Sequence, residues 1–321
     1  MKAVVYHNYG GPEVLELTEI EKPTLNENEV LVKVGGSGIN PVDTYFRKGI
    51  RPVSSFPFVP HHDLAGTVVE TGNKVENVQK GERVWATSVV GGTASEYVAV
   101  PSEKLFSLPK HITEAEGAAV AMAFMTAHLS LFYRAQLKAG ETVLIYGGAG
   151  AVGNAGIQLA KKFGAHVIAT AGSNEKAQLC LDAGADHVIS YNEENVVEKV
   201  AKLTNESGVD VILEMSLSEN MEDDFEMIKV GGRVVAIGSP ENNTPELPWR
   251  KLNQKHATLM GVLLFTTPPE EFRKAGEQIS KSLNDKKIKP HLAKTYTFEQ
   301  ASEAHQALEN KIYNGNIVLI P

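Results

Sequence analysis

The spacing of apolar residues changes along the chain. Up to about residue 112, short runs rich in β-branched residues are separated by Gly, Pro and Asn, which predicts a β-rich segment. We expect strands within the runs MKAVVY, VLVKVGGSGIN, LAGTVVETG, GERVWA and SEYVAVP. The run HITEAEGAAVAMAFMTAHLSLF follows and predicts a helix, with Thr113 as its N-cap and Glu116 three residues later.

From Glu141 onward, predicted strands alternate with predicted helices. The strands are TVLIYG, HVIATA, HVISY, VDVILE, RVVAIG and TLMGVLLF, and the helices include AVGNAGIQLAKKF and EKAQLCLDAG. This alternation predicts a parallel sheet covered on both faces, and six such strands match a doubly wound dinucleotide-binding fold. The final run, GNIVLIP, has no partner there, so we expect it to rejoin the β-rich part.

The segment YGGAGAVGNAGIQLAKKFGA carries the strongest chemical signal in the chain. Gly148, Gly150 and Gly153 form G-x-G-x-x-G between a predicted strand and a predicted helix. Such glycines let backbone N–H groups approach a pyrophosphate at a helix N-terminus. We expect the cofactor to contact Ala149, Gly150, Ala151 and Val152. The alternative is a tight turn that serves only packing.

The residues after the second α/β strand favour NADPH over NADH. An NAD site usually places Asp or Glu about 20 residues after the glycines, to hold the ribose 2′-hydroxyl. The strand HVIATAGSNEKAQ instead ends in Thr170, Ala171 and Gly172, without an acid. Gly172, Ser173 and Lys176 could bind a 2′-phosphate through backbone donors, a hydroxyl and an ammonium group. The alternative is that Lys176 is an ordinary surface lysine; whether NADH also serves is left open.

Composition limits the remaining function classes. The 321 residues suffice for two domains, and the net charge of -8 indicates neither nucleic acid nor an anionic membrane as a partner. The single cysteine, Cys180, excludes an internal disulfide and fits a reducing, cytoplasmic location. The start of the chain does not read as a secretory signal, and we expect no window to approach a membrane span.

Several motifs together resemble one family over essentially the whole chain. They are GINPVDTYFRKG, P-x-x-D-L-A-G, GGAGAVG, ATAGSNEKAQ, LEMS, GGRVVAIGS and GVLLF. In order and content they resemble the medium-chain dehydrogenase/reductase superfamily, and within it the zeta-crystallin-like NADPH:quinone oxidoreductases. The resemblance implies an α/β fold: a Rossmann doubly wound parallel sheet inserted into a β-rich, GroES-like domain. We expect residues 1–122 plus 266–321 to form the GroES-like catalytic domain and residues 123–265 the Rossmann domain.

The adjacent histidines in VPHHDLAG raise the possibility of a metal site. In zinc-dependent members of the superfamily a Cys stands where this chain has Asn40, a His stands at His62, and a further Cys or His lies near Ala123, where none occurs here. Catalytic zinc needs three protein ligands and structural zinc four thiolates, so we expect no metal. On an extended segment His61 and His62 would point to opposite sides. His62 is then either a polar residue of the active-site cleft or a buried, hydrogen-bonded structural histidine. Zeta-crystallin-like relatives usually carry Gly and then Ser or Thr at these two positions.

The resemblance also implies individual roles. Asn40, Tyr45 and His62 are the expected catalytic residues, with Tyr45 reaching the nicotinamide ribose or the substrate carbonyl. Further cofactor contacts are expected at Thr126, Tyr191, Ser218, Leu263, Leu264 and Phe265, of which Ser218 is the weakest because close relatives have Asn there. Gly238 and Ser239 follow the fifth α/β strand and should border the nicotinamide. Packing roles are the alternative for Tyr45, Thr126 and the Leu263–Phe265 run, and an exposed strand end for Tyr191.

These observations predict a zinc-independent oxidoreductase that transfers hydride from NADPH to a quinone. Quinones and enones accept hydride without a Lewis acid because the product charge is delocalised, so positioning of the reactants suffices. The alternatives are an NADPH-dependent alkene (enone) reductase and a non-enzymatic NADPH-binding protein. The apolar run VLLF on an edge strand suggests sheet extension across a two-fold axis, so we expect a homodimer.

Overall fold

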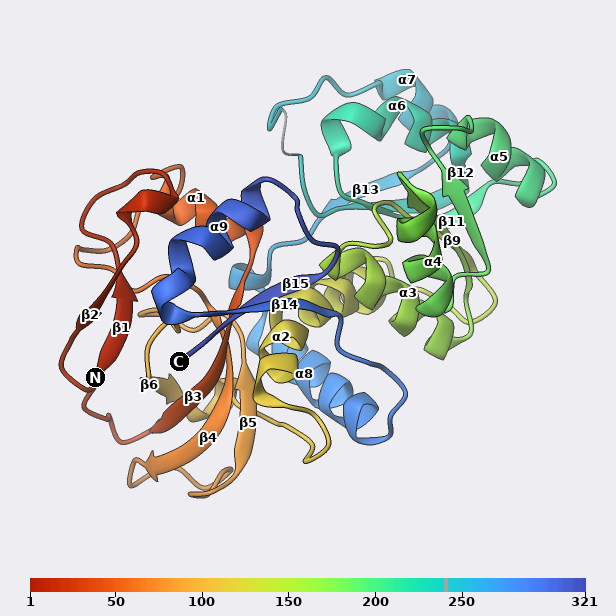
Figure 1. Ribbon diagram of the computed structural model, residues 1–321. Coiled ribbons are helices and arrows are strands. Elements are labelled where there is room, and N and C mark those ends of the chain that lie inside the picture. Colours follow the sequence, from red (N-terminus) through yellow and green to blue (C-terminus); the bar gives the residue numbers. More distant parts are fainter. Residues whose placement is uncertain (240–241) are drawn as a thin grey trace. The chain divides into compact units, whose positions relative to one another are not determined.

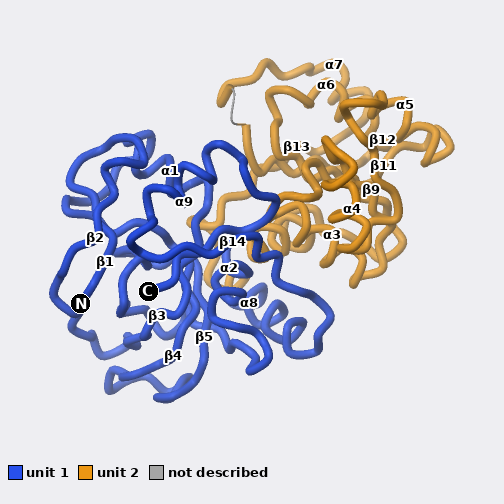
Figure 2. Tube along the Cα trace, in the orientation of Figure 1, with its two compact units in different colours: residues 1–122, 273–321 blue, residues 123–272 orange. Residues whose placement is uncertain are grey.

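The computed structural model describes residues 1–239 and 242–321, which divide into two units (Figure 2). Unit 1 contains residues 1–122 and 273–321, and unit 2 contains residues 123–272. One unit is therefore inserted into the sequence of the other. The domain limits predicted from the sequence, at 122/123 and 265/266, stay a prediction.

Unit 2 contains a parallel sheet of six strands among its described residues (Figure 1). In spatial order the strands are β10 (His187–Ser190), β9 (His166–Ala171), β8 (Thr142–Ile145), β11 (Val209–Glu214), β12 (Ile228–Ala236) and β13 (Thr258–Gly261). Numbered along the chain, this is the order 3-2-1-4-5-6 of a doubly wound fold. Residues 143–145 of the central strand β8 are all fully buried, as expected for a strand covered on both faces. The predicted Rossmann sheet is confirmed.

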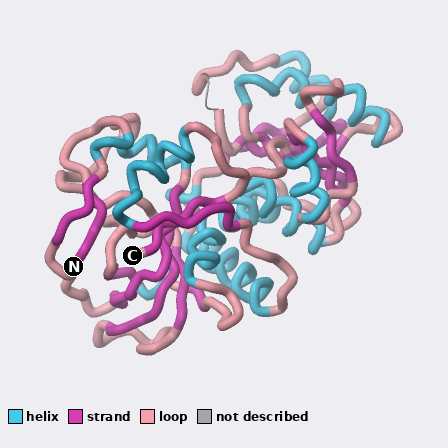
Figure 3. The backbone as a smooth tube through the Cα atoms, viewed as in Figure 1, coloured by secondary structure: helices cyan, strands magenta, loops and turns pink. Residues whose placement is uncertain are grey.

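Helices connect the strands of this sheet, and the alternation can be followed in Figure 3. They are α3 (Ala151–Phe163), α4 (Asn174–Asp182), α5 (Val196–Leu203), α6 (Leu217–Met227) and α7 (Trp249–Gln254). Val200 of α5 and Phe225 of α6 pack with Leu144, Ile168 and Ile212 of the sheet in one buried cluster. Burial of this apolar surface is the main term that stabilises the unit.

Unit 1 is rich in strands. Its larger sheet has the order β14 (Leu292–Thr297), β15 (Asn316–Ile320), β3 (Glu29–Ile39), β4 (Asp63–Thr71), β5 (Arg83–Ala86) and β7 (Phe106–Ser107), with β6 (Tyr97–Pro101) paired to β3. A separate hairpin pairs β1 (Lys2–Val5) with β2 (Glu16–Glu19). The C-terminal strand β15 pairs antiparallel with β3, as predicted for the run GNIVLIP.

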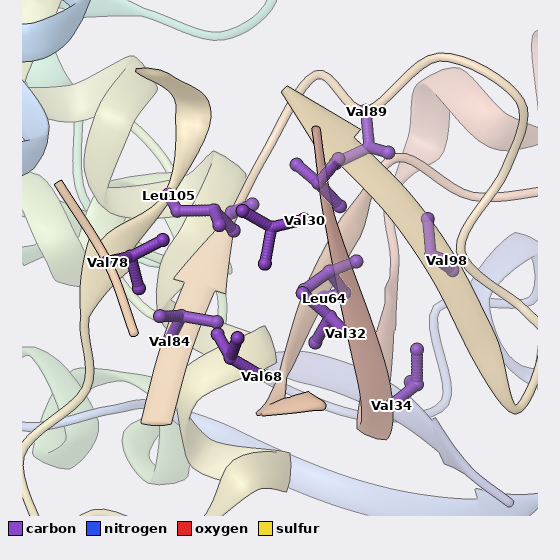
Figure 4. Packing of buried hydrophobic residues seen from close by; sticks show 12 residues of the cluster. Val30, Val32, Val34, Leu64, Val68, Val78, Val84, Val89, Val98 and Leu105 are labelled. Carbon is purple, nitrogen blue, oxygen red and sulfur yellow. The ribbon is translucent and has the colours of Figure 1, made fainter. Parts of the chain in front are cut away.

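Alternation along β3 builds the core of this unit. Val30, Val32 and Val34 share one face of the strand and are buried with Leu64 and Val68 of β4 (Figure 4). Unit 1 also contains the helices α1 (Pro41–Arg47) and α9 (Ala301–Glu309) and most of α8 (Pro269–Asn284). Short 3₁₀ turns occur at Pro12–Val14, Ser102–Lys104 and Phe298–Gln300.

The long central helix begins as predicted. α2 (Glu114–His128) is preceded by Thr113, whose backbone N–H donates to Glu116 across 2.7 Å, and the N–H of Glu116 returns to the Thr113 hydroxyl across 3.2 Å. Together with the π-helical turns at Leu129–Arg134, it is long and apolar enough to cross a membrane by length and composition alone. The expectation that no window approaches a membrane span is therefore wrong for this helix. However, 78% of its most apolar window is buried inside the structure, as in the core helix of a soluble protein.

Candidate active site

Most of the residues predicted to bind the cofactor lie at one edge of the sheet of unit 2. All strand pairs of this sheet are parallel, so their carboxyl ends share an edge, and ligands of such sheets bind there. Following those ends are Ala149, Gly150, Ala151 and Val152 after β8; Gly172, Ser173 and Lys176 after β9; Tyr191 after β10; Ser218 after β11; Gly238 and Ser239 after β12; and Leu263, Leu264 and Phe265 after β13. Starting from β8, the chain adds β9 and β10 on one side of the sheet and then crosses to the other side to add β11, β12 and β13. The crevice of this fold lies at this change of strand order, between β8 and β11.

The glycine loop is held against the neighbouring strand. The N–H of Gly148 donates to the carbonyl of Thr170 across 3.0 Å, and the N–H of Gly147 donates to the hydroxyl of the same residue across 3.1 Å. A Cβ at position 153 would clash with the carbonyl oxygen of Gly147, so the first turn of α3 and the loop touch without side chains between them. This close approach explains why the motif needs glycine at position 153, and the binding of a pyrophosphate at the N-terminus of α3 stays a prediction.

The end of β9 fits a nucleotide with a 2′-phosphate. No carboxylate follows Ala171 directly, and the hydroxyl of Ser173 caps α4 by accepting the N–H of Lys176 across 3.3 Å. Within the described part of the chain, Lys176 forms no ion pair. A Cβ on Gly172 would clash with the hydroxyl of Tyr191, so that phenol lies directly against the loop. Lys176, the hydroxyl of Ser173 and the N-terminus of α4 thus follow the end of β9, which is where the adenosine ribose binds in this fold.

The loops that follow β11 and β12 are joined by two hydrogen bonds. The N–H of Leu217 donates to the carbonyl of Gly238 across 3.0 Å, and the N–H of Ser218 donates to the hydroxyl of Ser239 across 3.2 Å. The hydroxyl oxygen of Ser218 is buried and has no hydrogen-bond partner among the described residues. The pair of loops is therefore one connected wall of the predicted nicotinamide half.

Two predictions in unit 2 fare differently. Leu263, Leu264 and Phe265 do not end the sixth strand, because β13 ends at Gly261 and a 3₁₀ turn covers Leu264–Thr266. The reason is the neighbouring strand: β12 ends at Ala236, which pairs with Gly261, so no strand backbone remains for later residues. Thr126 lies in α2 and accepts at its carbonyl the hydroxyl of Ser130 across 2.7 Å. Its contact with the cofactor stays a prediction.

In unit 1, the start of α1 and the start of β4 bring Asn40 and His62 onto the same carboxylate. Asp43 accepts the backbone N–H of Asn40 at Oδ2 and contacts Nδ1 of His62 at Oδ1, both at 2.7 Å. The carboxyl group of Asp43 is almost fully buried, and the ring of His62 packs at 4.9 Å from the ring of Phe46. Because an ionised carboxylate can only accept, Nδ1 of His62 carries a proton.

Asp63 forms a second buried carboxylate beside this pair. Its Oδ2 accepts the side-chain amide of Asn40 at 2.8 Å and the backbone N–H of Met122 at 3.0 Å, and its Oδ1 accepts the Thr87 hydroxyl at 2.5 Å. Burial raises the pKa of Asp63 to about 7, although these hydrogen bonds oppose the rise by favouring the ionised form. Asn40 is thus held by two buried acids, through its backbone N–H by Asp43 and through its side-chain amide by Asp63.

Tyr45 has a less constrained position. It lies on α1 between Thr44 and Phe46, its side chain is half-buried, and its phenol makes no hydrogen bond among the described residues. The structure brings Asn40 and His62 together, whereas it records no bond between Tyr45 and either of them. The catalytic role of all three stays a prediction.

The two adjacent histidines use their ring nitrogens on different partners. His61 contacts Ser37 through Nδ1 and His305 through Nε2, both at 2.9 Å, whereas His62 contacts Asp43. His61 has a φ of 73°, in the left-handed region, and not the extended backbone expected from the sequence. Across residues 1–239 and 242–321, no group of three or more His, Cys, Asp or Glu side chains is placed to hold a metal.

The sequence reasoning missed several residues of this region. Asp43, Thr87 and His305 all contact the predicted site residues or their neighbours, yet none of the three was singled out. Asp43 lies three residues after Asn40 at the start of a helix, which is a capping signal that could have identified it. His305 gives no local signal, because it lies 244 residues from His61.

Comparison with known proteins identifies the family. Residues 26–110 match the model described as alcohol dehydrogenase GroES-like domain, and residues 151–281 match the model described as zinc-binding dehydrogenase. A human protein named quinone oxidoreductase is 34% identical over 310 residues, which cover 95% of this chain and 93% of the relative. The chain belongs to the quinone oxidoreductase family. It is thus a member of the medium-chain dehydrogenase/reductase superfamily, as the motifs predict.

Members of the quinone oxidoreductase family from bacteria are similar over their whole length. Quinone oxidoreductase 1 of Escherichia coli is 31% identical, with 99% of both chains covered. A crystal structure of the Escherichia coli quinone oxidoreductase complexed with NADPH superposes with a TM-score of 0.90 at 31% identity, covering 100% of both chains. A mycobacterial family member complexed with NADPH has the same TM-score and identity. The GroES-like and Rossmann architecture is therefore that of the family.

Proposed function

We propose that this chain is an NADPH-dependent quinone oxidoreductase. The observation that carries the proposal is the carboxyl edge of the unit 2 sheet, where a glycine loop and an acid-free β9 end next to Lys176 fit a phosphorylated dinucleotide. Relatives named quinone oxidoreductase, and a related structure that contains NADPH, support the same assignment. Reduced nicotinamide supplies a hydride, and a quinone accepts it without a Lewis acid.

The residues of unit 2 bind and orient the cofactor. Backbone groups at 149–152 and the N-terminus of α3 offer donors to the pyrophosphate, and Ser173 with Lys176 offers donors to a 2′-phosphate. The joined loops at Ser218 and at Gly238–Ser239 form the wall for the nicotinamide half. Leu263, Leu264, Phe265, Thr126 and Tyr191 complete the proposed cofactor contacts.

The residues of unit 1 act on the substrate. Nδ1–H of His62 donates to Asp43, so Nε2 is the atom through which His62 exchanges a proton with a reduced substrate. The phenol of Tyr45 can donate one hydrogen bond to a developing oxyanion. Asn40 is held by Asp43 and Asp63 and orients this part of α1. These roles require no metal, and we propose that turnover is independent of zinc.

An edge strand and a buried cysteine support proposals for the oligomeric state and the cellular location of the protein. We propose a homodimer that forms through β13, because this strand is one of the two edges of the unit 2 sheet and pairs only with β12 among the described residues. The single, buried Cys180 suits a reducing compartment, so we propose a cytoplasmic location. Sedimentation of a monomer at micromolar concentration would contradict the dimer.

The decisive experiment measures NADPH oxidation by the purified chain with a panel of quinones and a matched panel of enones, with and without a strong chelator. We expect turnover with quinones that survives dialysis against the chelator. Turnover with enones alone would replace the proposal by an alkene reductase. Tight NADPH binding without turnover on any acceptor would indicate a non-enzymatic role. Loss of turnover in chelator, restored by zinc, would overturn the metal-free chemistry.

A further inference from the structure

A continuous chain of hydrogen bonds crosses the interior of unit 1 behind the catalytic segment. Its members are Arg47 of α1, His305 of α9, His61, Ser37 of β3, Thr93 and the backbone of Asp63. These six residues are between 0% and 2% exposed, so none of the bonds competes with bulk water. Buried polar groups cost free energy unless each donor meets an acceptor, so the positions of the protons are determined.

Chemistry fixes the direction of every bond in the chain. A guanidinium has donors only, so Nδ1 of His305, at 3.2 Å from Arg47, is an acceptor and its proton is on Nε2. That Nε2–H donates to Nε2 of His61 across 2.9 Å, so the proton of His61 is on Nδ1. Nδ1–H of His61 then donates to the hydroxyl of Ser37 across 2.9 Å.

The two hydroxyl groups continue the chain in the same direction. The hydroxyl of Thr93 donates to the carbonyl of Asp63 across 2.8 Å, so it must accept from Ser37, also at 2.8 Å. The backbone N–H groups of Thr93 and Ala94 both donate to the carbonyl of Pro60, at 3.0 and 3.2 Å. The segment from Pro60 to Asp63 is thus held at both ends by the loop that carries Thr93.

The far end of the chain is anchored by charge. Arg47 also donates through Nε to the carbonyl of Gly10 across 3.2 Å and forms an ion pair with Glu309, which in turn contacts Lys48 at 3.2 Å. Because the guanidinium is held in three directions, it cannot rotate to offer His305 another geometry. The order of protons is therefore imposed from Arg47 inward.

Both imidazoles remain neutral in this arrangement. Burial lowers the pKa of His61 to about 4, and burial, with His61 and Arg47 nearby, lowers the pKa of His305 well below its ordinary value. A proton added to either ring would place two N–H groups against each other or an N–H against the guanidinium. The geometry alone already requires this result, because the chain has an acceptor nitrogen on each ring.

We propose that His305 and His61 are positioning residues whose fixed opposite tautomers hold the segment Pro60–Asp63 and thereby aim His62. The side chains of His61 and Asp63 both bind buried partners, which holds the backbone on either side of His62 in the position from which its ring reaches Asp43. The left-handed backbone of His61 would otherwise favour glycine, and the two ring contacts of His61 hold the residue in that conformation. The proposal rests on the proposed catalytic role of His62, whereas the proton order does not.

The first test observes the protons directly. Histidines are labelled with ¹⁵N and ¹³C in the full chain, and the ten residues are assigned by single substitutions. Nitrogen shifts at neutral pH are expected to show His305 as the Nε2–H tautomer and His61 as the Nδ1–H tautomer. An Nε2–H tautomer of His61, or a charged ring on either residue, would overturn the proposal whether or not the chain reduces quinones.

The second test compares variants at position 305. His305→Leu removes both contacts at similar volume, whereas in His305→Gln one amide offers an acceptor to Arg47 and a donor to His61. We expect H305L to shift the ring resonances of His62 and to lower kcat by about tenfold to about a hundredfold, with the KM for NADPH unchanged. We expect H305Q to restore both readouts.

A third variant separates positioning from folding. His61→Gly keeps the left-handed backbone without strain but removes the ring, so it should reproduce the H305L effect on His62 and on kcat. If H305L and H61G leave the His62 resonances and kcat at wild-type values, the chain of hydrogen bonds has only a structural role and the proposal fails. If wild-type protein shows no quinone turnover, the resonances of His62 still decide the positioning claim, and the proposed function alone is lost.

Discussion

The side-chain amide of Asn40 donates to Oδ2 of Asp63 across 2.8 Å, and the backbone N–H of Met122 donates to the same oxygen across 3.0 Å. Both donors are obligatory, so this oxygen remains an acceptor in either protonation state of Asp63. A proton on the acid must be on Oδ1, where the hydroxyl of Thr87 can reverse and accept it. The arrangement accommodates the neutral acid without losing a hydrogen bond.

Replacement of Asp63 by Asn should therefore keep the fold and change its pH dependence. The pKa of Asp63 rises from the ordinary 3.8 to about 7 in the folded state, so between these pH values the folded protein binds more protons than the unfolded chain. The contribution of Asp63 to the free energy of unfolding thus falls as pH rises through this window, by roughly 4 kcal/mol in total.

Urea unfolding between about pH 5 and about pH 8, a range that includes the upper part of this window, measures the effect. Trp85, buried in unit 1, reports unfolding in a Trp249→Phe background, which removes the exposed tryptophan of unit 2. As pH rises, the free energy of unfolding of the wild type should fall relative to that of D63N. A difference that does not depend on pH would show that Asp63 is ionised throughout.

Replacement of Asp43 by Asn should reverse the tautomer of His62. The backbone N–H of Asn40 needs an acceptor, so the new amide must present its oxygen there and its NH₂ group to Nδ1 of His62. His62 would then carry its proton on Nε2 and lose a negative partner. We expect kcat to fall by about a hundredfold or more, in the range of general acid–base effects. Asp285→Asn, the same change at an exposed acid of unit 1, is the control; equal rates in both variants would remove His62 from the chemistry.

The parts of the molecule that could be predicted from sequence are those that depend on residues close to one another in the sequence. The strands of unit 2 and α3 follow from runs of apolar residues between glycines, because a buried parallel strand is apolar on both faces. The glycine loop and the acid-free end of β9 could likewise be predicted, because the binding of a dinucleotide depends on residues within one βαβ unit. The resemblance to relatives then supplied the arrangement of the two units along the chain.

The parts that were not predictable depend on contacts between distant segments. Ser37, His61, Thr93 and His305 form one chain of bonds, but they come from four separate segments and share no spacing that could be recognised. The adjacent His61 and His62 look alike in sequence and are held by different partners. The end of β13 at Gly261 was also missed, because a strand ends where its neighbour ends, and the neighbour is not visible in the sequence run.

Replacement of Lys176 by Glu tests the choice of cofactor. Lys176 lies in the first turn of α4, and its backbone N–H binds the hydroxyl of Ser173, next to where a 2′-phosphate is expected. Charge reversal should raise the KM for NADPH by about tenfold or more, because a charge-assisted hydrogen bond contributes roughly 1.5–3 kcal/mol. The KM for NADH should change far less. Lys202→Glu, the same charge reversal at an exposed position of α5, is the control. If NADPH and NADH are affected equally, Lys176 does not contact the 2′-phosphate.

The glycine loop offers a pair of variants that separate folding from binding. Alanine at Gly153 would clash with the carbonyl of Gly147, so G153A should lower both the melting temperature and NADPH affinity. At Gly150 the backbone has an ordinary φ of -75°, and a new Cβ meets only the carbonyl of Gly147, at 3.3 Å. G150A should therefore fold with a melting temperature near that of wild type, while its methyl group occupies space beside the N-terminus of α3 that an anion needs. We expect titration with NADPH, followed by nicotinamide fluorescence, to show weaker binding for G150A. Because G150A should keep its fold, weaker binding could not be attributed to unfolding. Unchanged affinity in G150A would place the pyrophosphate away from this loop.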